Sequence, residues 1–164
     1  MLVIAVFGFK KAGKTRLSSM LVSALKARRY RVAAAKHVHH PDFTIDREGS
    51  DSWRLYTSGA DPVIIMSPME TAVIYRSATA RGLDDLKALA GDVDFLVMEG
   101  FQSLVASSPE GVVRIRVLSR EGEEVGEDEL PASFYPNPRA KYVLPEGFED
   151  LLSEILRLAP KGSK

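Results

Sequence analysis

Residues 8–15 read Gly8-Phe9-Lys10-Lys11-Ala12-Gly13-Lys14-Thr15 and match every fixed position of the pattern G-x-x-x-x-G-K-[ST]. A continuous apolar run, Leu2 to Phe7, precedes them and is typical of a strand buried on both faces. Apolar residues then recur at helical spacing from Leu17 to Leu25. This order of strand, glycine loop and helix directs backbone N–H groups and a helix N terminus at one anion. The sequence therefore predicts a loop that binds nucleotide phosphates.

The composition indicates one compact domain. A chain of 164 residues can bury a real core, and its 22 acidic and 22 basic residues balance, so no net charge favours nucleic acid or a membrane surface. The absence of cysteine excludes disulfides and thiolate metal sites. No apolar run reaches membrane-spanning length, so we expect no membrane segment and a cytoplasmic location. We expect residues 1–160 to form the nucleotide-binding domain and residues 161–164 to be a flexible tail.

The apolar pattern alternates between strands and helices along the chain. Strands are expected at residues 2–7, 31–36, 61–66, 71–75, 93–98 and 112–118, and a short final strand with its entry loop at residues 137–144. Helices are expected at residues 16–26, 51–56, 83–90 and 148–158. Partial alternation in residues 112–118 favours a strand nearer the sheet edge, and residues 119–129 are predicted to be an exposed excursion. The predicted fold class is α/β: a single-domain, P-loop NTPase-like fold with a mostly parallel sheet and helices on both faces.

The side chains of the loop suit a triphosphate and its metal ion. Lys14 has the reach to neutralise charge on the β- and γ-phosphates, and Thr15 offers a hydroxyl to Mg²⁺. Gly8 and Gly13 allow the sharp path of the backbone. The other residues predicted to bind the phosphates are Phe9, Lys10, Lys11, Ala12 and Arg16. A plain glycine turn with a solvated lysine is the alternative, and it explains neither Thr15 nor the flanking elements.

A second buried strand ends in an acid. Glu99 and Gly100 follow the apolar residues 95–98. A phosphate-binding loop needs an acid on a neighbouring strand to hold the metal's water shell or to position the attacking water. We therefore predict Lys14 and Glu99 as catalytic residues and Thr15 with Glu99 as the Mg²⁺ site, with the N–H of Gly100 turned to the γ-phosphate. A carboxylate merely solvated at the sheet edge is the alternative.

All three histidines lie in one polar segment, Lys36-His37-Val38-His39-His40, which Asp46 and Asp51 follow. Because it comes after the second strand, this segment should open on the same carboxyl edge as the loop. Three interpretations stay open: a transition-metal site of histidines, a set of phosphate contacts with an aspartate behind Mg²⁺, or an ordinary surface loop.

Two further positions have alternative interpretations. Trp53 and Tyr56 are expected either to stack on a base or pterin or to pack the core of their short helix. Asn137, in the sequence Tyr-Pro-Asn-Pro, is expected either to read a base edge or to form a turn.

With these clusters placed, the chain resembles the molybdopterin-guanine dinucleotide biosynthesis protein B (MobB) family. The resemblance is carried by GFKKAGKT at residues 8–15, KHVHH at residues 36–40, DREGSDSWR at residues 46–54 and MEGF at residues 98–101. It extends from the start of the chain to about Phe101.

The resemblance implies a cytoplasmic homodimer that binds GTP with Mg²⁺ and hydrolyses it slowly. It also implies a partner, a molybdopterin nucleotidyltransferase that joins GMP to molybdenum cofactor, and neither nucleic acid nor membrane as a partner. Residues 8–15 would hold the phosphates and Thr15 with Glu99 would serve Mg²⁺. The adjoining pocket would be lined by Lys36, His37, His39, Asp46 and Asp51. The preference for guanine follows from the resemblance alone.

Two other functions use the same loop. A small-molecule or polynucleotide kinase would need a lid of arginines over the phosphates, and the arginines at positions 114, 116, 120 and 139 are scattered. A metal-delivery GTPase would use the histidine segment to handle its metal.

Overall fold

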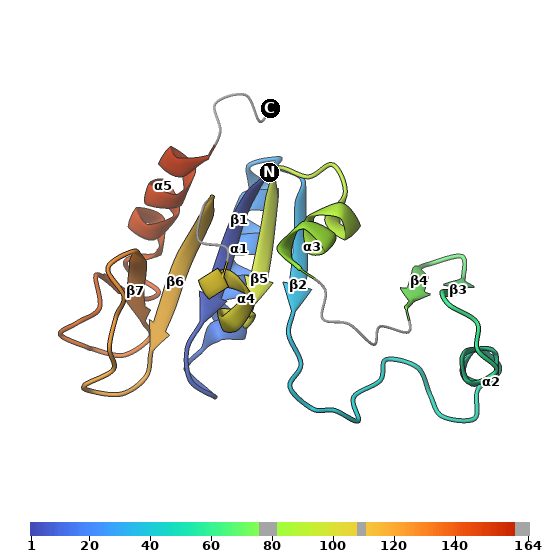
Figure 1. The fold of residues 1–164 in the computed structure, drawn as a ribbon. Helices are drawn as coiled ribbons and strands as arrows, with labels where there is room; N and C mark the ends of the chain where they lie inside the picture. The colour runs from blue at the N-terminus through green and yellow to red at the C-terminus, as the bar shows by residue number, and fades with distance from the viewer. Residues whose placement is uncertain (76–81, 108–110, 160–164) are drawn as a thin grey trace. The chain divides into compact units, whose positions relative to one another are not determined.

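The computed structural model describes residues 1–75, 82–107 and 111–159 (Figure 1). The chain forms two compact units, Met1–His37 with Gly82–Lys164, and Val38–Arg81. The first unit holds a six-stranded sheet and the second a two-stranded sheet. The predicted tail, residues 161–164, lies outside the described residues. Among the helices that are described, none has the length and apolar character needed to cross a membrane.

The six-stranded sheet is parallel and has the order β2–β5–β1–β6–β7–β8. Its strands are β1 (Leu2–Phe7), β2 (Val32–Lys36), β5 (Phe95–Glu99), β6 (Val112–Leu118), β7 (Glu129–Ser133) and β8 (Tyr142–Val143). In the register, Glu99 lies opposite Val6 on one side and opposite Lys36 on the other. The carboxyl ends of β1, β2 and β5 therefore meet at one point of the sheet edge.

Helices cover both faces of this sheet, as the sequence predicts. They are α1 (Lys14–Ala27), α3 (Leu83–Ala90), α4 (Gln102–Ser107) and α5 (Phe148–Leu158). Residues 2, 4 and 6 of β1 join the buried cluster that contains α1 and α5, and residues 3, 5 and 7 join the cluster that contains α3 and α4. Because both faces of β1 are covered, its sequence is apolar at every position.

The second unit consists of α2 (Asp51–Thr57) and a hairpin of β3 (Val63–Met66) with β4 (Thr71–Ile74). The turn of the hairpin is closed by the N–H of Ser67, which donates to the carbonyl of Glu70 at 2.9 Å. No residue of α2 is buried. This unit therefore has little apolar core within its described residues.

Two predicted elements have the same bounds in the structure. The first strand is Leu2–Phe7 and the last helix Phe148–Leu158, as the apolar patterns predict. The last helix buries Phe148, Leu151, Leu152 and Ile155, so a strong amphipathic pattern fixed both its existence and its inward face.

The second half of the chain departs from the sequence-based expectations in several places. β6 lies inside the sheet, between β1 and β7, and not near its edge. β7 was not predicted, because Glu129 begins it and Pro131 interrupts its pattern. α4 was not predicted either. β8, Tyr142–Val143, is the short final strand expected with its entry loop in residues 137–144. The excursion after β6 includes a buried carboxylate, Glu123, which accepts from the N–H groups of Ser119 and Arg120.

The last helix allows a direct test of the core. Leu151→Ala removes a fully buried side chain and should lower the free energy of unfolding by about 2–5 kcal/mol. Leu158→Ala, on the same helix with 56% of its leucine exposed, should cost less than about 1 kcal/mol. Urea unfolding followed by far-ultraviolet circular dichroism measures both changes. Equal losses in the two variants would contradict the described packing of α5.

Candidate functional site

The candidate phosphate loop, residues 8–13, leaves the carboxyl end of β1 and leads into α1. Two glycines, Gly8 and Gly13, allow the backbone of this loop to take its path. A Cβ on Gly8 would lie 2.3 Å from the carbonyl oxygen of Val117, and one on Gly13 would lie 2.5 Å from the ring of Phe134. Gly13 also has φ of +101°, which other residues rarely adopt. Gly8, with φ of +148°, has a positive φ as well, so both positions require glycine for space and for backbone conformation.

The N terminus of α1 faces this loop without a side-chain cap. Gly13 is the N-cap residue, and the first turn holds no acidic side chain. The first N–H groups of a helix carry partial positive charge and attract anions. The ammonium of Lys14, which begins α1, donates to the carbonyl of Phe9 at 2.7 Å and so bridges the loop. Buried Ala12 anchors the loop, and its N–H donates to the same carbonyl at 3.2 Å.

The structure brings three predicted site residues together at one carboxylate. The hydroxyl of Thr15 donates to Oε1 of Glu99 at 2.8 Å, and the ammonium of Lys36 lies 2.5 Å from the same oxygen. The side chain of Glu99 is only 12% exposed, whereas that of Lys36 is 57% exposed. These residues come from α1, β5 and β2, so the parallel sheet creates the cluster.

His37 directly follows β2, and Gly100 directly follows the neighbouring strand β5. The N–H of His37 donates to the carbonyl of Glu99 at 2.9 Å, and the His37 ring contacts Phe101 with centroids 5.2 Å apart. The N–H of Gly100 donates to the carbonyl of Val6 at 2.9 Å. That N–H continues the ladder of the sheet, so the prediction that it turns to a γ-phosphate does not match this arrangement.

The remaining predicted phosphate contacts lie on the surface of the loop and of α1. Phe9 is half-exposed and Lys10 and Lys11 are exposed. The guanidinium of Arg120 lies 5.0 Å from the Phe9 ring centroid, and that of Arg16 lies 4.4 Å from the ring centroid of Phe134. No local pattern indicates either pair, because the partners are more than 100 residues apart in the chain.

The other predicted residues belong to the second unit. His39 and His40 are exposed, and the carboxylate of Asp51 is fully exposed with Arg54 at 3.8 Å. In the described residues, no three histidine, aspartate or glutamate side chains gather into a metal-binding group.

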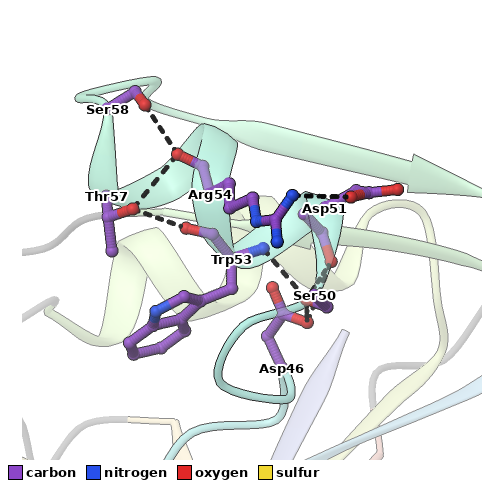
Figure 2. Close-up of polar contacts among 8 residues, drawn as sticks. Asp46, Ser50, Asp51, Trp53, Arg54, Thr57 and Ser58 are labelled. Carbon is purple, nitrogen blue, oxygen red and sulfur yellow. Dashed lines mark hydrogen bonds and ion pairs between the residues drawn. The ribbon is translucent and has the colours of Figure 1, made fainter.

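Asp46 organises the loop before α2 (Figure 2). Its Oδ1 accepts from the hydroxyls of Ser50 at 3.0 Å and Ser52 at 2.9 Å and from the N–H of Arg47 at 2.8 Å. Ser50 in turn caps α2 by accepting from the N–H of Trp53 at 3.1 Å. Burial acts to raise the pKa of Asp46, but these hydrogen bonds outweigh it and hold the pKa below its ordinary value. The carboxylate is therefore ionised at neutral pH.

Trp53 and Tyr56 contact each other, with ring centroids 5.8 Å apart, and both line a cavity of about 460 Å³ inside the second unit. The helix core that the sequence offered as one alternative does not form, since neither ring is buried. Asn137 has a turn role: its Oδ1 accepts from the N–H of Arg139 at 3.0 Å and its amide donates to the carbonyl of Arg120 at 3.2 Å.

Residues 3–130 match the sequence profile of the family described as MobB: Molybdopterin guanine dinucleotide synthesis protein B. Two relatives named "Molybdopterin-guanine dinucleotide biosynthesis adapter protein" are each 32% identical. The match with the Escherichia coli protein covers 78% of this chain and 71% of the relative, and the match with the Haemophilus influenzae protein covers 61% and 57%. The chain thus spans little more than half the length of the Haemophilus relative.

Solved structures show the same fold. Bacillus subtilis MobB has a TM-score of 0.70 at 17% identity, with 98% of this chain and 99% of that chain covered. A crystal structure of molybdopterin-guanine biosynthesis protein B (mobB) has a TM-score of 0.63 at 23% identity, with 96% and 99% covered. The sequence match and the fold agree, and the chain belongs to the MobB family.

Proposed function

We propose that this chain binds GTP with Mg²⁺ at residues 8–15, hydrolyses it slowly, and assists a partner nucleotidyltransferase in adding GMP to molybdenum cofactor. The observation that carries the proposal is the cluster of Thr15, Lys36 and Glu99 beside the N terminus of α1. The names of the relatives support the pathway, since both contain molybdopterin-guanine dinucleotide and the word adapter. An adapter acts through a second protein, which supports the proposed partner.

The triphosphate would be held by backbone N–H groups and by ammonium groups. The uncapped N terminus of α1 supplies the N–H groups, and Lys14 bends over the loop toward Phe9. A phosphate oxygen would compete with that carbonyl for the Lys14 ammonium, and as the charged acceptor it would form the stronger bond. Exposed Lys10 and Lys11 add positive charge that attracts the nucleotide.

The oxygens of Thr15 and Glu99 fit a Mg²⁺ ion. In octahedral coordination with bonds of about 2.1 Å, neighbouring oxygen ligands lie about 3.0 Å apart. The two oxygens here are 2.8 Å apart. When bound, Mg²⁺ neutralises charge on the β- and γ-phosphates. Glu99 would serve the ion directly or through its water shell.

Lys36 balances the charge of Glu99. Its ammonium lies 2.5 Å from the carboxylate, which is largely buried and would otherwise be an uncompensated charge. When a divalent cation takes over that role, the more exposed Lys36 is free to turn to a phosphate oxygen. Hydrolysis should be slow, because none of the arginines in the described ranges is committed to the position of a γ-phosphate. A homodimer and guanine specificity remain part of the proposal.

The first test removes the ammonium at the loop. Lys14→Ala should weaken GTP binding by about tenfold or more, since a charge-assisted contact to phosphate is lost. Lys26→Ala removes an exposed ammonium in the last turn of the same helix and should leave the affinity unchanged. Isothermal titration calorimetry of both variants measures the effect. Equal affinity of Lys14→Ala and the unchanged chain would overturn the assignment of the loop.

The second test separates binding from metal-dependent turnover. Glu99→Gln keeps the shape of the side chain but loses its charge, so it should bind GTP and lose Mg²⁺-dependent phosphate release. Glu127→Gln, an exposed glutamate in the segment before β7, is the control and should hydrolyse GTP at the normal rate. Phosphate release is followed over a range of Mg²⁺ concentrations. Normal turnover of Glu99→Gln would give Glu99 a structural role only.

A further inference from the structure

The phosphate loop has a different neighbour on each side. It leaves the carboxyl end of β1, and in the sheet β1 lies between β5 and β6 (Figure 1). The β5 side carries Glu99 with its partners Thr15 and Lys36. The β6 side continues into a turn of residues 119–123, whose one basic side chain is that of Arg120. This arginine comes from the side of the loop that the Glu99 cluster does not occupy.

The backbone of Arg120 is fixed at both its N–H and its carbonyl. The N–H donates to Oε1 of Glu123 at 2.7 Å, and the carbonyl accepts from the amide of Asn137 at 3.2 Å. The same Oε1 accepts from the N–H and the hydroxyl of Ser119, at 2.9 and 3.0 Å. Glu123 is only 8% exposed, and its carbonyl accepts from the guanidinium of Arg139 at 2.8 Å. A buried carboxylate therefore holds the turn that presents Arg120.

The side chain of Arg120 is exposed and contacts the loop. Its guanidinium lies 5.0 Å from the centroid of the Phe9 ring, beside a cavity of about 560 Å³. Three glutamates line the same cavity, yet across residues 1–75, 82–107 and 111–159 no acid forms an ion pair with Arg120. Contact with a ring face leaves the N–H donors at the edge of a guanidinium unused. The charge of Arg120 is thus not committed to the fold, and its side chain has room to turn.

Phe9 holds two cations at once. Its carbonyl accepts from the ammonium of Lys14 at 2.7 Å, and its ring carries the guanidinium of Arg120. The lysine of such a loop reaches the β- and γ-phosphates of a nucleotide, so these phosphates would lie close to Phe9. Both cations would gain from that acceptor, because a hydrogen bond between ionised partners is stronger than a contact with a neutral carbonyl or ring.

We propose that Arg120 binds the terminal phosphate of the nucleotide, by turning from the Phe9 ring to the oxygens of that phosphate. This inference rests on the proposed GTP site at residues 8–15. The planar guanidinium donates two parallel hydrogen bonds to a phosphate group.

The position of Arg120 selects the terminal phosphate rather than the inner ones. Backbone N–H groups of the loop would enclose the α- and β-phosphates. The γ-phosphate projects beyond them and is open to a side chain from the neighbouring turn of residues 119–123. GDP has no phosphate at this position, so Arg120 makes the chain discriminate GTP from GDP.

Isothermal titration calorimetry with GTP and with GDP, each with Mg²⁺, tests this contact. Arg120→Ala should bind GTP about tenfold more weakly or worse, since charge-assisted hydrogen bonds are lost, and should bind GDP as the unchanged chain does. The turn itself should persist, because its hydrogen bonds with Glu123 and Asn137 use the backbone of residue 120. A loop damaged by the substitution would weaken GDP binding as well, so the comparison of the two nucleotides separates contact from damage.

Arg157→Ala is the matched control. It removes an exposed guanidinium in the last turn of α5 and should leave both affinities unchanged. A loss in Arg120→Ala that this control does not show comes from position 120 and not from the change in net charge.

The contrast between GTP and GDP decides the outcome. An unchanged GTP affinity in Arg120→Ala, or equal losses for GTP and GDP, would overturn the contact with the terminal phosphate. In either case, weaker GTP binding by Lys14→Ala would still support the phosphate loop, so the two failures are distinguishable. If the unchanged chain bound neither nucleotide, the proposed GTP site would be wrong, and this contact with it.

Discussion

The parallel pairing of β1 with β5 is the constraint on which the candidate site depends. It places Glu99 opposite Val6, at the point where the chain leaves β1 and enters the phosphate loop. The pairing of β2 with β5 brings Lys36 to the same carboxylate. Thr15, at the start of α1, then donates to Glu99 across the sheet edge. A slip of one residue in either register would turn these side chains to the opposite face and separate the cluster.

The sequence predicted the parts of this arrangement that are local. A strand, a glycine loop and a helix follow one another within the first 27 residues, and the apolar period of each is clear. Glu99 was predicted because an acid directly follows a buried run. That the glycine loop and Glu99 lie close together could be inferred as well, since parallel strands end at a common edge of the sheet.

Other features depend on contacts between distant residues, and the sequence could not reveal them. Gly13 is fixed by the ring of Phe134, which is far along the chain. The sequence suggested the N–H of Gly100 as a phosphate contact. In the structure it donates to the carbonyl of Val6 and so belongs to the hydrogen bonding of the sheet. β7 contains Pro131, but β6 pairs with it along its whole length and the carbonyl of Pro131 accepts from the N–H of Lys141 at 2.9 Å. A single-domain organisation, a homodimer and a cytoplasmic location stay predictions.

A crystal structure with Mg²⁺ and a non-hydrolysable GTP analogue tests the central claim most directly. The account predicts that the β- and γ-phosphates lie over residues 8–15, with Lys14 turned from the Phe9 carbonyl to a phosphate oxygen. It also predicts a metal ion bound at the hydroxyl of Thr15, with Glu99 beside it as a ligand or behind its water shell; Thr15 and Glu99 are hydrogen-bonded at 2.8 Å in the present structure. Nucleotide bound elsewhere, with both of these hydrogen bonds unchanged, would contradict it.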